Sequence, residues 1–372
     1  MLFKKIFCLL MSVFIACSVC LPCLAKDESW VTAHSAVLYC PENGEFLYEK
    51  NADEFSLIAS LTKIMTAVVV IENTSPQETV SVDKAAVGVE GSSAYLCANE
   101  LLTVENLLYA LLLDSANDAA VALAIHTSGN VPEFVKLMNK KAEELGMSET
   151  HYENPHGLDS DGHGSSARDL AILSAYALKN EEFLKITQTK SIHIDDCDGE
   201  NSHYFINHNR MLSIYDGTVG IKTGYTKSSG RCLVSAAKRN GVTLIAVTLN
   251  APNDWNDHQI MLDYGFSAVK SVLLPDALTT FEINVVSGSK STVKAIAESQ
   301  SFVFDRAVDT NTSTVFLKQF YFAPIKKGDI IGSIVYFYNG DVIAFVPIRA
   351  EEHSEEIKYK RSFLETIAYF FR

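Results

Sequence analysis

Three short segments of this sequence carry the residue types of a serine acyl-transfer site: Ser60-Leu61-Thr62-Lys63, Ser115-Ala116-Asn117 and Lys222-Thr223-Gly224. A serine hydroxyl is a poor nucleophile until a base takes its proton. A lysine can act as that base when burial and nearby positive charge lower its pKa. Because Ser-x-x-Lys alone occurs six times in the chain, the prediction depends on the order and the setting of all three segments.

Ser60 stands immediately before a largely apolar run, residues 61–71, that contains no Gly or Pro. This run predicts a buried helix with Ser60 at its N-terminal end. Lys63 would then lie one turn along the helix, on the same face as Ser60. The nucleophile and its base would be neighbours; a plain helix cap is the alternative that this spacing leaves open.

The second segment interrupts a helical pattern. Residues 101–113 predict a helix with a broad apolar face, and another helical run follows to Ile125. In the polar interruption, Ser115 could relay a proton and the Asn117 amide could hold a substrate carbonyl. A capped turn between two helices is the alternative reading of the same residues.

The third segment precedes a β-rich stretch, residues 231–250, in which Asn240-Gly241 signals a hairpin. Lys222-Thr223-Gly224 is therefore predicted on or beside a strand. There Lys222 would add positive charge near the nucleophile, the Thr223 hydroxyl could bind a carboxylate, and Gly224 would let a substrate backbone approach closely. An exposed strand lysine followed by a turn is the alternative.

Together these segments resemble the low-molecular-weight penicillin-binding proteins of the serine D-alanyl-D-alanine carboxypeptidase type, peptidase family S11. The resemblance runs from about Ser35 to Phe266 and continues more loosely beyond. Besides the three segments, it depends on Ser115-Ala116-Asn117-Asp118-Ala119-Ala120, Asn154-Pro155-His156-Gly157-Leu158-Asp159, Ala167-Arg168-Asp169-Leu170, Gly220-Ile221-Lys222-Thr223-Gly224-Tyr225-Thr226 and Asp263-Tyr264-Gly265-Phe266.

The resemblance implies an α/β (α+β) fold of the serine β-lactamase and DD-peptidase kind, with helices packed on an antiparallel sheet. It implies catalytic roles for Ser60, Lys63 and Ser115, and substrate binding by Asn117, Lys222, Thr223, Gly224 and Tyr225. Ser60 would be the acylated nucleophile and Lys63 its base, while Ser115 and Lys222 would serve proton transfer to the leaving group. The backbone N–H groups of Ser60 and Tyr225 would form the oxyanion hole.

One departure from the family concerns the substrate carboxylate. Some relatives carry an arginine shortly after the strand that follows Lys-Thr-Gly, where it helps to hold the terminal carboxylate. In this chain Asp254-Trp255-Asn256-Asp257-His258 occupies that region. Lys222, Thr223 and Arg231 are then the candidates for holding the carboxylate.

The N-terminal residues predict export. Residues 1–25 combine two lysines, an apolar run from Ile6 to Cys17 and a cleavage site after Ala25, which is typical of a signal peptide; a lipoprotein anchor is the alternative.

The net charge of −14 argues against a nucleic-acid partner. The cysteines that remain after cleavage show no metal-binding pattern, and both free thiols and disulfides stay open: Cys40, Cys97, Cys197 and Cys232.

Beyond residue 276 the sequence changes to short β-rich runs separated by turns, which predicts a small all-β domain. The predicted domains are a signal peptide (1–25), a catalytic domain (26–272), a β-rich domain (276–350), and a tether with an amphipathic helix (351–372). Apolar residues within 360–372 follow helical spacing, which favours an in-plane membrane anchor. The segment is too short to span a bilayer. A helix docked on the protein's own core is the alternative.

The sequence thus predicts an exported serine D-Ala-D-Ala carboxypeptidase that acts in cell-wall maturation, at the outer face of the cytoplasmic membrane. It would remove the terminal D-alanine from peptidoglycan stem pentapeptides through a Ser60 acyl-enzyme, and β-lactams would acylate the same serine. Neither a metal nor an organic cofactor is expected, because lysines and an oxyanion hole supply the chemistry. The zinc alternative, with His151, His156 and His163, lacks the spacing of a firm ligand pair.

Two other functions stay open at this point. A class A-like β-lactamase would share the three segments but would need a glutamate that activates the deacylating water, for which Glu149 and Glu153 are the nearest candidates. A low-turnover penicillin-binding or wall-scaffolding protein would keep the fold with little catalysis.

Overall fold

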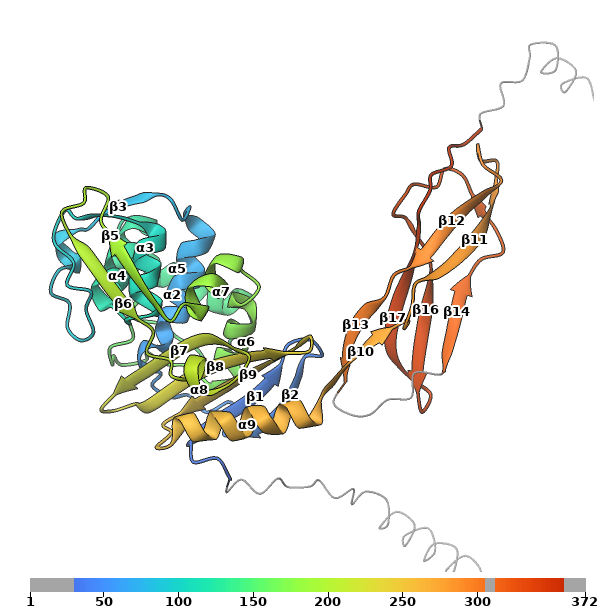
Figure 1. The fold of residues 1–372 in the computed structure, drawn as a ribbon. Helices are drawn as coiled ribbons and strands as arrows, with labels where there is room; N and C mark the ends of the chain where they lie inside the picture. The colour runs from blue at the N-terminus through green and yellow to red at the C-terminus, as the bar shows by residue number, and fades with distance from the viewer. Residues whose placement is uncertain (1–29, 305–311, 358–372) are drawn as a thin grey trace, which may run out of the picture.

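The computed structural model describes residues 30–304 and 312–357. Figure 1 shows two bodies along the chain, a mixed helix-and-sheet body that ends with α9 (Asp254–Ala268) and an all-β body that follows it. The signal peptide predicted over 1–25 and the amphipathic helix predicted over 360–372 lie outside the described residues. Within the described ranges, no helix is both long and apolar enough to cross a membrane.

A five-stranded antiparallel sheet forms the centre of the first body. Its strand order is β2-β1-β9-β8-β7, with β1 (Ser35–Cys40), β2 (Glu45–Lys50), β7 (Thr218–Thr226), β8 (Gly230–Arg239) and β9 (Val242–Leu249). The predicted hairpin joins β8 to β9, and Asn240 and Gly241 both have positive φ, as a tight hairpin turn requires. Strand β7, which carries Lys222-Thr223-Gly224, is therefore an edge strand of this sheet.

Helices cover both faces of the sheet because its strands alternate apolar side chains between two cores. Val37 and Val247 face a core shared with most of the helices, whereas Leu38 and Leu244 face a second core shared with α9. The first group of helices is α2 (Thr62–Asn73), α3 (Val104–Leu112), α4 (Asn117–Ser128), α5 (Val131–Glu144), α6 (Ala167–Ala177) and α7 (Glu181–Gln188). The short α8 (Met211–Ile214) joins α9 on the second face. The predicted fold class, helices packed on an antiparallel sheet, is confirmed.

The helix predicted over residues 101–113 is wrong at its N-terminal end. Residues Leu101–Thr103 form strand β4, which pairs with β3 (Thr79–Ser81), and α3 begins only at Val104. The Thr103 hydroxyl accepts a hydrogen bond from the Asn106 backbone N–H at 3.1 Å and caps the helix. Because an N-cap residue has extended backbone geometry, the apolar residues before it continue as a strand.

Three smaller elements complete the first body. The 3-10 turn η2 (Ala59–Leu61) leads directly into α2, and a second 3-10 turn, η3 (Lys84–Ala86), follows β3. Strands β5 (Ser191–Asp195) and β6 (Ser202–Ile206) form a separate two-stranded hairpin. The loop after β6 returns the chain toward β7.

The all-β body has a six-stranded sheet in the order β14-β16-β17-β12-β11-β15. These strands are β11 (Thr279–Val286), β12 (Thr292–Ala297), β14 (Ser313–Leu317), β15 (Tyr321–Phe322), β16 (Ile330–Tyr338) and β17 (Asp341–Ala350). They enclose a core of their own that includes Ile283, Val293 and Val346. The all-β character predicted for this part is confirmed. Strand β10 (Lys270–Leu274) pairs with β13 (Gln300–Phe304), so the second body begins shortly after α9.

Candidate active site

Ser60 lies in η2, where the chain turns sharply into helix α2. The preceding residue, Ala59, has φ +47°, a left-handed conformation that non-glycine residues rarely adopt. Gly157 packs directly on this bend: a Cβ at position 157 would lie 2.0 Å from the Ala59 carbonyl oxygen, so only glycine fits. The Thr62 hydroxyl donates to the same carbonyl at 2.9 Å. Ser60 is thus presented by a bend that its neighbours hold in place.

The Lys63 ammonium group is buried directly beside Ser60. Its Nζ donates to Ser60 Oγ at 3.0 Å, to Asn117 Oδ1 at 2.7 Å and to the His156 carbonyl at 2.6 Å. These contacts use all three ammonium protons. Burial, with the positive charge of Lys222 as a second cause, lowers the pKa of Lys63 well below its usual value. The neutral amine is therefore easier to reach than in an exposed lysine, and in that form Nζ can accept a proton from the neighbouring Ser60 Oγ.

Ser115 lies in the turn between α3 and α4, and Asn117 is the first residue of α4. The backbone of Ser115 is left-handed, with φ +62°. The side-chain amide of Asn117 accepts from Lys63 and donates to the Glu90 carbonyl at 2.5 Å, and its backbone N–H donates to the Ser92 carbonyl at 2.7 Å. Asn117 thereby connects the lysine to the loop that precedes β4.

Strand β7 brings the third segment against η2. A Cβ at Gly224 would lie 3.1 Å from the Ser60 backbone nitrogen, so glycine permits this close approach of the strand. Lys222 is buried and donates from Nζ to the Thr223 carbonyl at 3.0 Å. Burial lowers the pKa of Lys222 to about 7, and the negative charge of Asp114 opposes that shift.

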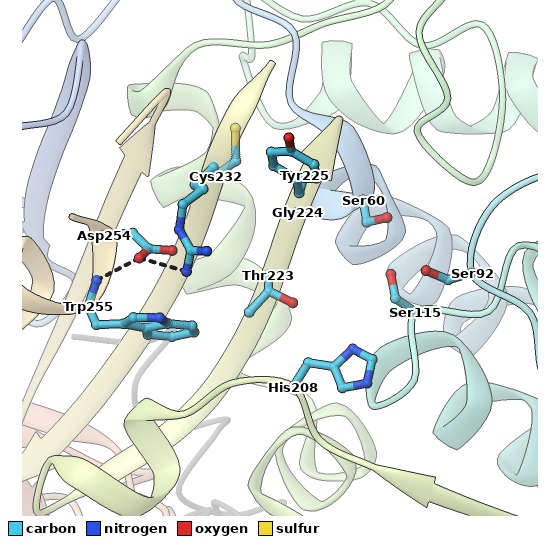
Figure 2. Close-up of a pocket in the computed structure, with 11 residues that line it drawn as sticks. Ser60, Ser92, Ser115, His208, Thr223, Gly224, Tyr225, Cys232, Asp254 and Trp255 are labelled. Carbon is cyan, nitrogen blue, oxygen red and sulfur yellow. Dashed lines mark hydrogen bonds and ion pairs between the residues drawn. The ribbon is translucent and has the colours of Figure 1, made fainter. Parts of the chain in front are cut away.

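The three segments meet around one cavity of about 320 Å³. Figure 2 shows the hydroxyl groups of Ser60, Ser115 and Thr223 around the same space. The cavity is lined by Ser60, Ser92, Ser115, His208, Thr223, Gly224, Tyr225, Arg231, Cys232, Asp254 and Trp255. This volume lies within the range of small-ligand sites.

The wall opposite Ser115 contains the segment that departs from the family pattern. Arg231 on β8 forms an ion pair with Asp254 at 3.0 Å, and its guanidinium lies 5.8 Å from the centre of the Trp255 ring. Asp254 Oδ1 also accepts the Trp255 backbone N–H at 2.9 Å. The arginine is therefore oriented by a buried carboxylate while its own side chain stays half exposed to the cavity.

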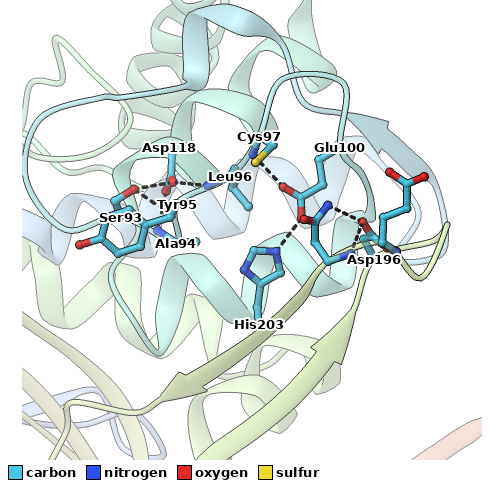
Figure 3. Close-up of polar contacts among 11 residues, drawn as sticks. Ser93, Ala94, Tyr95, Leu96, Cys97, Glu100, Asp118, Asp196 and His203 are labelled. Atoms are coloured by element: carbon cyan, nitrogen blue, oxygen red, sulfur yellow. Dashed lines mark hydrogen bonds and ion pairs between the residues drawn. The ribbon is translucent and has the colours of Figure 1, made fainter.

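The loop before β4 closes the cavity on a third side, and two carboxylates hold it (Figure 3). Asp118 accepts from the Ser93 hydroxyl at 2.7 Å and from the backbone N–H groups of Ala94 and Leu96 at 3.0 and 3.1 Å. Glu100 pairs with His203 at 2.6 Å. These contacts hold the loop that carries Ser92, which lines the cavity.

Both ring nitrogens of His163, in the loop near Gly157, have hydrogen-bond partners within the protein. Its Nδ1 accepts the Glu153 backbone N–H at 3.0 Å, so the neutral ring carries its proton on Nε2, which lies 2.8 Å from Thr62 Oγ1. Burial lowers the pKa of His163 to about 4 and favours this neutral form. Both ring nitrogens are therefore engaged in hydrogen bonds within the protein.

The cysteines among the described residues are free thiols: Cys40, Cys97, Cys197 and Cys232. Cys232 lines the cavity, and burial raises its pKa to about 11. Its thiol therefore stays protonated near neutral pH and is a poor nucleophile. Ser60, in contrast, has the Lys63 amine 3.0 Å from its hydroxyl oxygen.

Sequence reasoning missed several residues of the cavity wall. Ser92 and His208 are single polar residues in loops, where no periodic spacing marks them. Asp254 and Trp255 drew notice only as a departure from the family pattern, and Arg231 only as a substitute for a missing arginine. The predicted residues Lys63, Asn117 and Lys222 lie behind the cavity surface, where they contact its lining.

Comparisons with known proteins agree over most of the chain. Residues 24–253 match the peptidase S11 family described as D-alanyl-D-alanine carboxypeptidase, and residues 278–356 match the C-terminal domain of penicillin-binding protein 5. The D-alanyl-D-alanine carboxypeptidase DacF of Bacillus subtilis (strain 168) is 35% identical, with 86% of this chain and 85% of the relative covered. DacC of Escherichia coli (strain K12) is 33% identical, with 88% and 85% covered.

Solved structures give the same result. The crystal structure of penicillin binding protein 5 from Haemophilus influenzae matches with a TM-score of 0.67 and 30% sequence identity, covering 88% of this chain and 98% of that one. The DD-transpeptidase of Streptomyces K15 matches with a TM-score of 0.61 and 32% identity, covering 64% of this chain and 98% of that one. The second match covers a smaller share of this chain than the first.

Proposed function

This chain belongs to the D-alanyl-D-alanine carboxypeptidase family, and we propose that it removes the terminal D-alanine from peptidoglycan stem pentapeptides through an acyl-enzyme on Ser60. One observation carries this proposal: the buried Lys63 amine lies 3.0 Å from Ser60 Oγ at a cavity that Thr223 and Arg231 also line. A nucleophile, a base with a lowered pKa and carboxylate-binding groups are the parts that the reaction needs.

The first half of the reaction forms an ester on Ser60. Neutral Lys63 takes the Ser60 proton, and Oγ attacks the carbonyl carbon of the penultimate D-alanine. The backbone N–H groups of Ser60 and Tyr225 hold the resulting oxyanion. When the C–N bond breaks, the nitrogen of the terminal D-alanine receives a proton through Ser115 and Lys222 and leaves as an amine.

The second half hydrolyses this ester with water and returns the proton to Ser60. A β-lactam places its strained amide carbonyl where the peptide carbonyl sits, so it acylates the same oxygen. Neither glutamate considered for a β-lactamase lines the cavity. Glu153 pairs with His151 at 2.8 Å on an exposed surface, and the Glu149 backbone N–H donates to Asp169. This favours slow hydrolysis of bound penicillin.

The proposed function is tested by free D-alanine release from a peptide that ends in Lys-D-Ala-D-Ala. We expect the chain from residue 26 onward to release D-alanine and to bind a fluorescent penicillin covalently. Penicillin binding without D-alanine release would instead support a wall-scaffolding protein. Rapid penicillin hydrolysis without D-alanine release would support a β-lactamase.

Arg231 is expected to hold the substrate's terminal carboxylate together with Thr223. Arg231→Gln should raise KM for the D-Ala-D-Ala peptide about tenfold with a smaller change in kcat, because a charge-assisted hydrogen bond to the carboxylate is lost. Arg231→Lys keeps the positive charge but not the planar guanidinium, so its KM should lie between those of the parent and Arg231→Gln. The measurement is steady-state kinetics of D-alanine release.

A matched substrate gives this prediction its control. A peptide whose terminal carboxylate is replaced by a carboxamide offers Arg231 no negative charge, so the Arg231→Gln variant should match the parent enzyme with it. Equal losses on the acid and the amide would show that Arg231 only supports the wall through Asp254 and does not recognise the carboxylate.

Export to the outer face of the cytoplasmic membrane, with attachment through residues 360–372, completes the proposal. A chain shortened to end at Lys358 should move from the membrane pellet to the supernatant, because the apolar face expected of the tail supplies the attachment. Sedimentation of cell fractions, followed with a fluorescent penicillin, measures this. Continued sedimentation of the shortened chain would place the attachment elsewhere.

A further inference from the structure

Asp114 and His208 form a pair at the edge of the catalytic cavity. Asp114 directly precedes Ser115 in the turn between α3 and α4, and His208 lies in the loop that follows β6. The His208 Nε2 atom is 3.3 Å from Asp114 Oδ1, and the His208 backbone N–H donates to the Leu113 carbonyl at 3.4 Å. Figure 2 shows the His208 side chain beside Ser115, below Thr223. One residue thus holds the Ser115 turn at two consecutive positions.

This turn has an unfavourable backbone geometry that needs support. Ser115 has φ +62°, which costs free energy in a residue other than glycine and persists only when the surroundings fix it. The backbone N–H of Ala116 donates to the Ala110 carbonyl at 3.1 Å, which holds the C-terminal side of the turn. The contacts from His208 hold its N-terminal side.

The same pair lies within the electrostatic reach of Lys222. Lys222 has a pKa of about 7 because burial disfavours its charge, and Asp114 is the carboxylate that acts in the opposite direction. Burial, with the charge of Lys222 as a second cause, lowers the pKa of His208. The charge of Lys222 also acts on Lys63 of α2, and Arg231 and Asp254 line the cavity.

We propose that Asp114, held by His208, is a positioning residue that places a carboxylate beside the proton path through Lys222 and presents Ser115 to the leaving group. This inference rests on the proposed function, in which Lys222 and Ser115 deliver a proton to the departing D-alanine. When the C–N bond breaks, the nitrogen takes the Ser115 hydroxyl proton, and Ser115 takes one from Lys222, which regains it from solvent. A neutral Lys222 has no ammonium proton to supply to Ser115.

The sign of the expected effect follows from charge. A nearby carboxylate favours the protonated form of a lysine, so removing it lowers the pKa of Lys222. The ammonium form is present below that pKa and is lost above it. The alkaline limb of kcat/KM for D-alanine release, which Lys222 would set, should therefore move to lower pH in Asp114→Asn. We expect a shift of about one pH unit, which is a loss of about tenfold on the alkaline side of the limb.

Two His208 variants distinguish the effect of a charge beside Lys222 from the effect of changing the side chain at position 208. His208→Arg places a permanent positive charge beside Lys222 and should also move the alkaline limb to lower pH. His208→Gln, which is neutral and can still donate to Asp114, should leave that limb where it is in the parent. The carboxylate-retaining variant Asp114→Glu should restore the parent limb, which a purely structural role of Asp114 would not predict.

The experiment measures kcat/KM for D-alanine release across pH for the parent and these four variants, with covalent fluorescent-penicillin labelling of each. If the parent neither labels nor releases D-alanine, the proposed function has failed, whatever the role of Asp114. If the parent is active and the alkaline limb stays in place in both Asp114→Asn and His208→Arg, the inference is overturned. Should Asp114→Asn fail to fold, the contrast between His208→Arg and His208→Gln decides the question alone.

Discussion

Replacing Ser60 with alanine is expected to abolish both D-alanine release and covalent labelling by a fluorescent penicillin. No acyl-enzyme can form without the hydroxyl, and removing a catalytic nucleophile typically lowers kcat by about 10⁴ to 10⁶. The fold should survive, because Ser60 Oγ accepts one bond from Lys63, whose other two acceptors, Asn117 and His156, remain. Gel fluorescence after penicillin labelling and thermal unfolding measure the two parts of this result.

The chain offers a matched control for this variant. Ser81-Val82-Asp83-Lys84 has the same Ser-x-x-Lys spacing, but Ser81 lies exposed at the end of β3. Ser81→Ala should label and turn over like the parent protein. Labelling that persists in Ser60→Ala and disappears in another serine variant would move the nucleophile to that residue.

Replacing Lys63 with methionine is expected to slow acylation by about 10² to 10⁴, the range that a general base typically contributes. Methionine fills similar space but cannot take the Ser60 proton. Lys63→Arg is the informative partner variant: it keeps a positive charge and hydrogen-bond donors, but a guanidinium is not deprotonated in proteins. Both variants should fail alike if Lys63 acts as a base. Stopped-flow acylation by a chromogenic β-lactam gives the rate.

The pH dependence of acylation gives an independent check on Lys63. The pKa of Lys63 is lowered by burial first and by the charge of Lys222 second, which favours the neutral amine. As pH falls through the pKa of Lys63, the amine gains a proton and the acylation rate should decrease. The residual rate of Lys63→Met should lack this acid limb. Acylation of the Lys63→Arg variant at close to the parent rate would show that the charge at this position, and not its basicity, matters.

The local geometry of the site could be predicted from the sequence because it depends on short-range periodicity. Ser60 and Lys63 are three residues apart where the 3-10 turn η2 leads into α2, and this short helical spacing makes them neighbours. The β-rich stretch and hairpin signal that follow Lys222, Thr223 and Gly224 predict them on or beside a strand, and β7 contains all three. The one error of this kind, Leu101–Thr103, arose because pairing with β3 prevailed over an apolar pattern that also fits a helix.

The family resemblance predicts the roles of the site residues. Only the tertiary structure shows how close the three segments lie to one another. Lys63 and Asn117 are 54 residues apart, yet their side chains meet at 2.7 Å because α2 and α4 pack in the same core. Residues without a motif, such as His208 and Trp255, reach the cavity from loops and helix ends. Their positions depend on how segments far apart in the sequence pack on a shared core, and a local sequence pattern does not predict that packing.

The sequence by itself determined which groups could do chemistry and the order in which they occur. The tertiary structure decided which of them are buried, and therefore which ones can act. As exposed side chains, Lys63 and Lys222 would have ordinary pKa values. Burial is the first cause that lowers both, and the charge of Lys222 lowers the pKa of Lys63 further. Burial is produced by the packing of the helices and the sheet around these amines, so their reactivity is a property of the whole fold and not of the short segments that contain them.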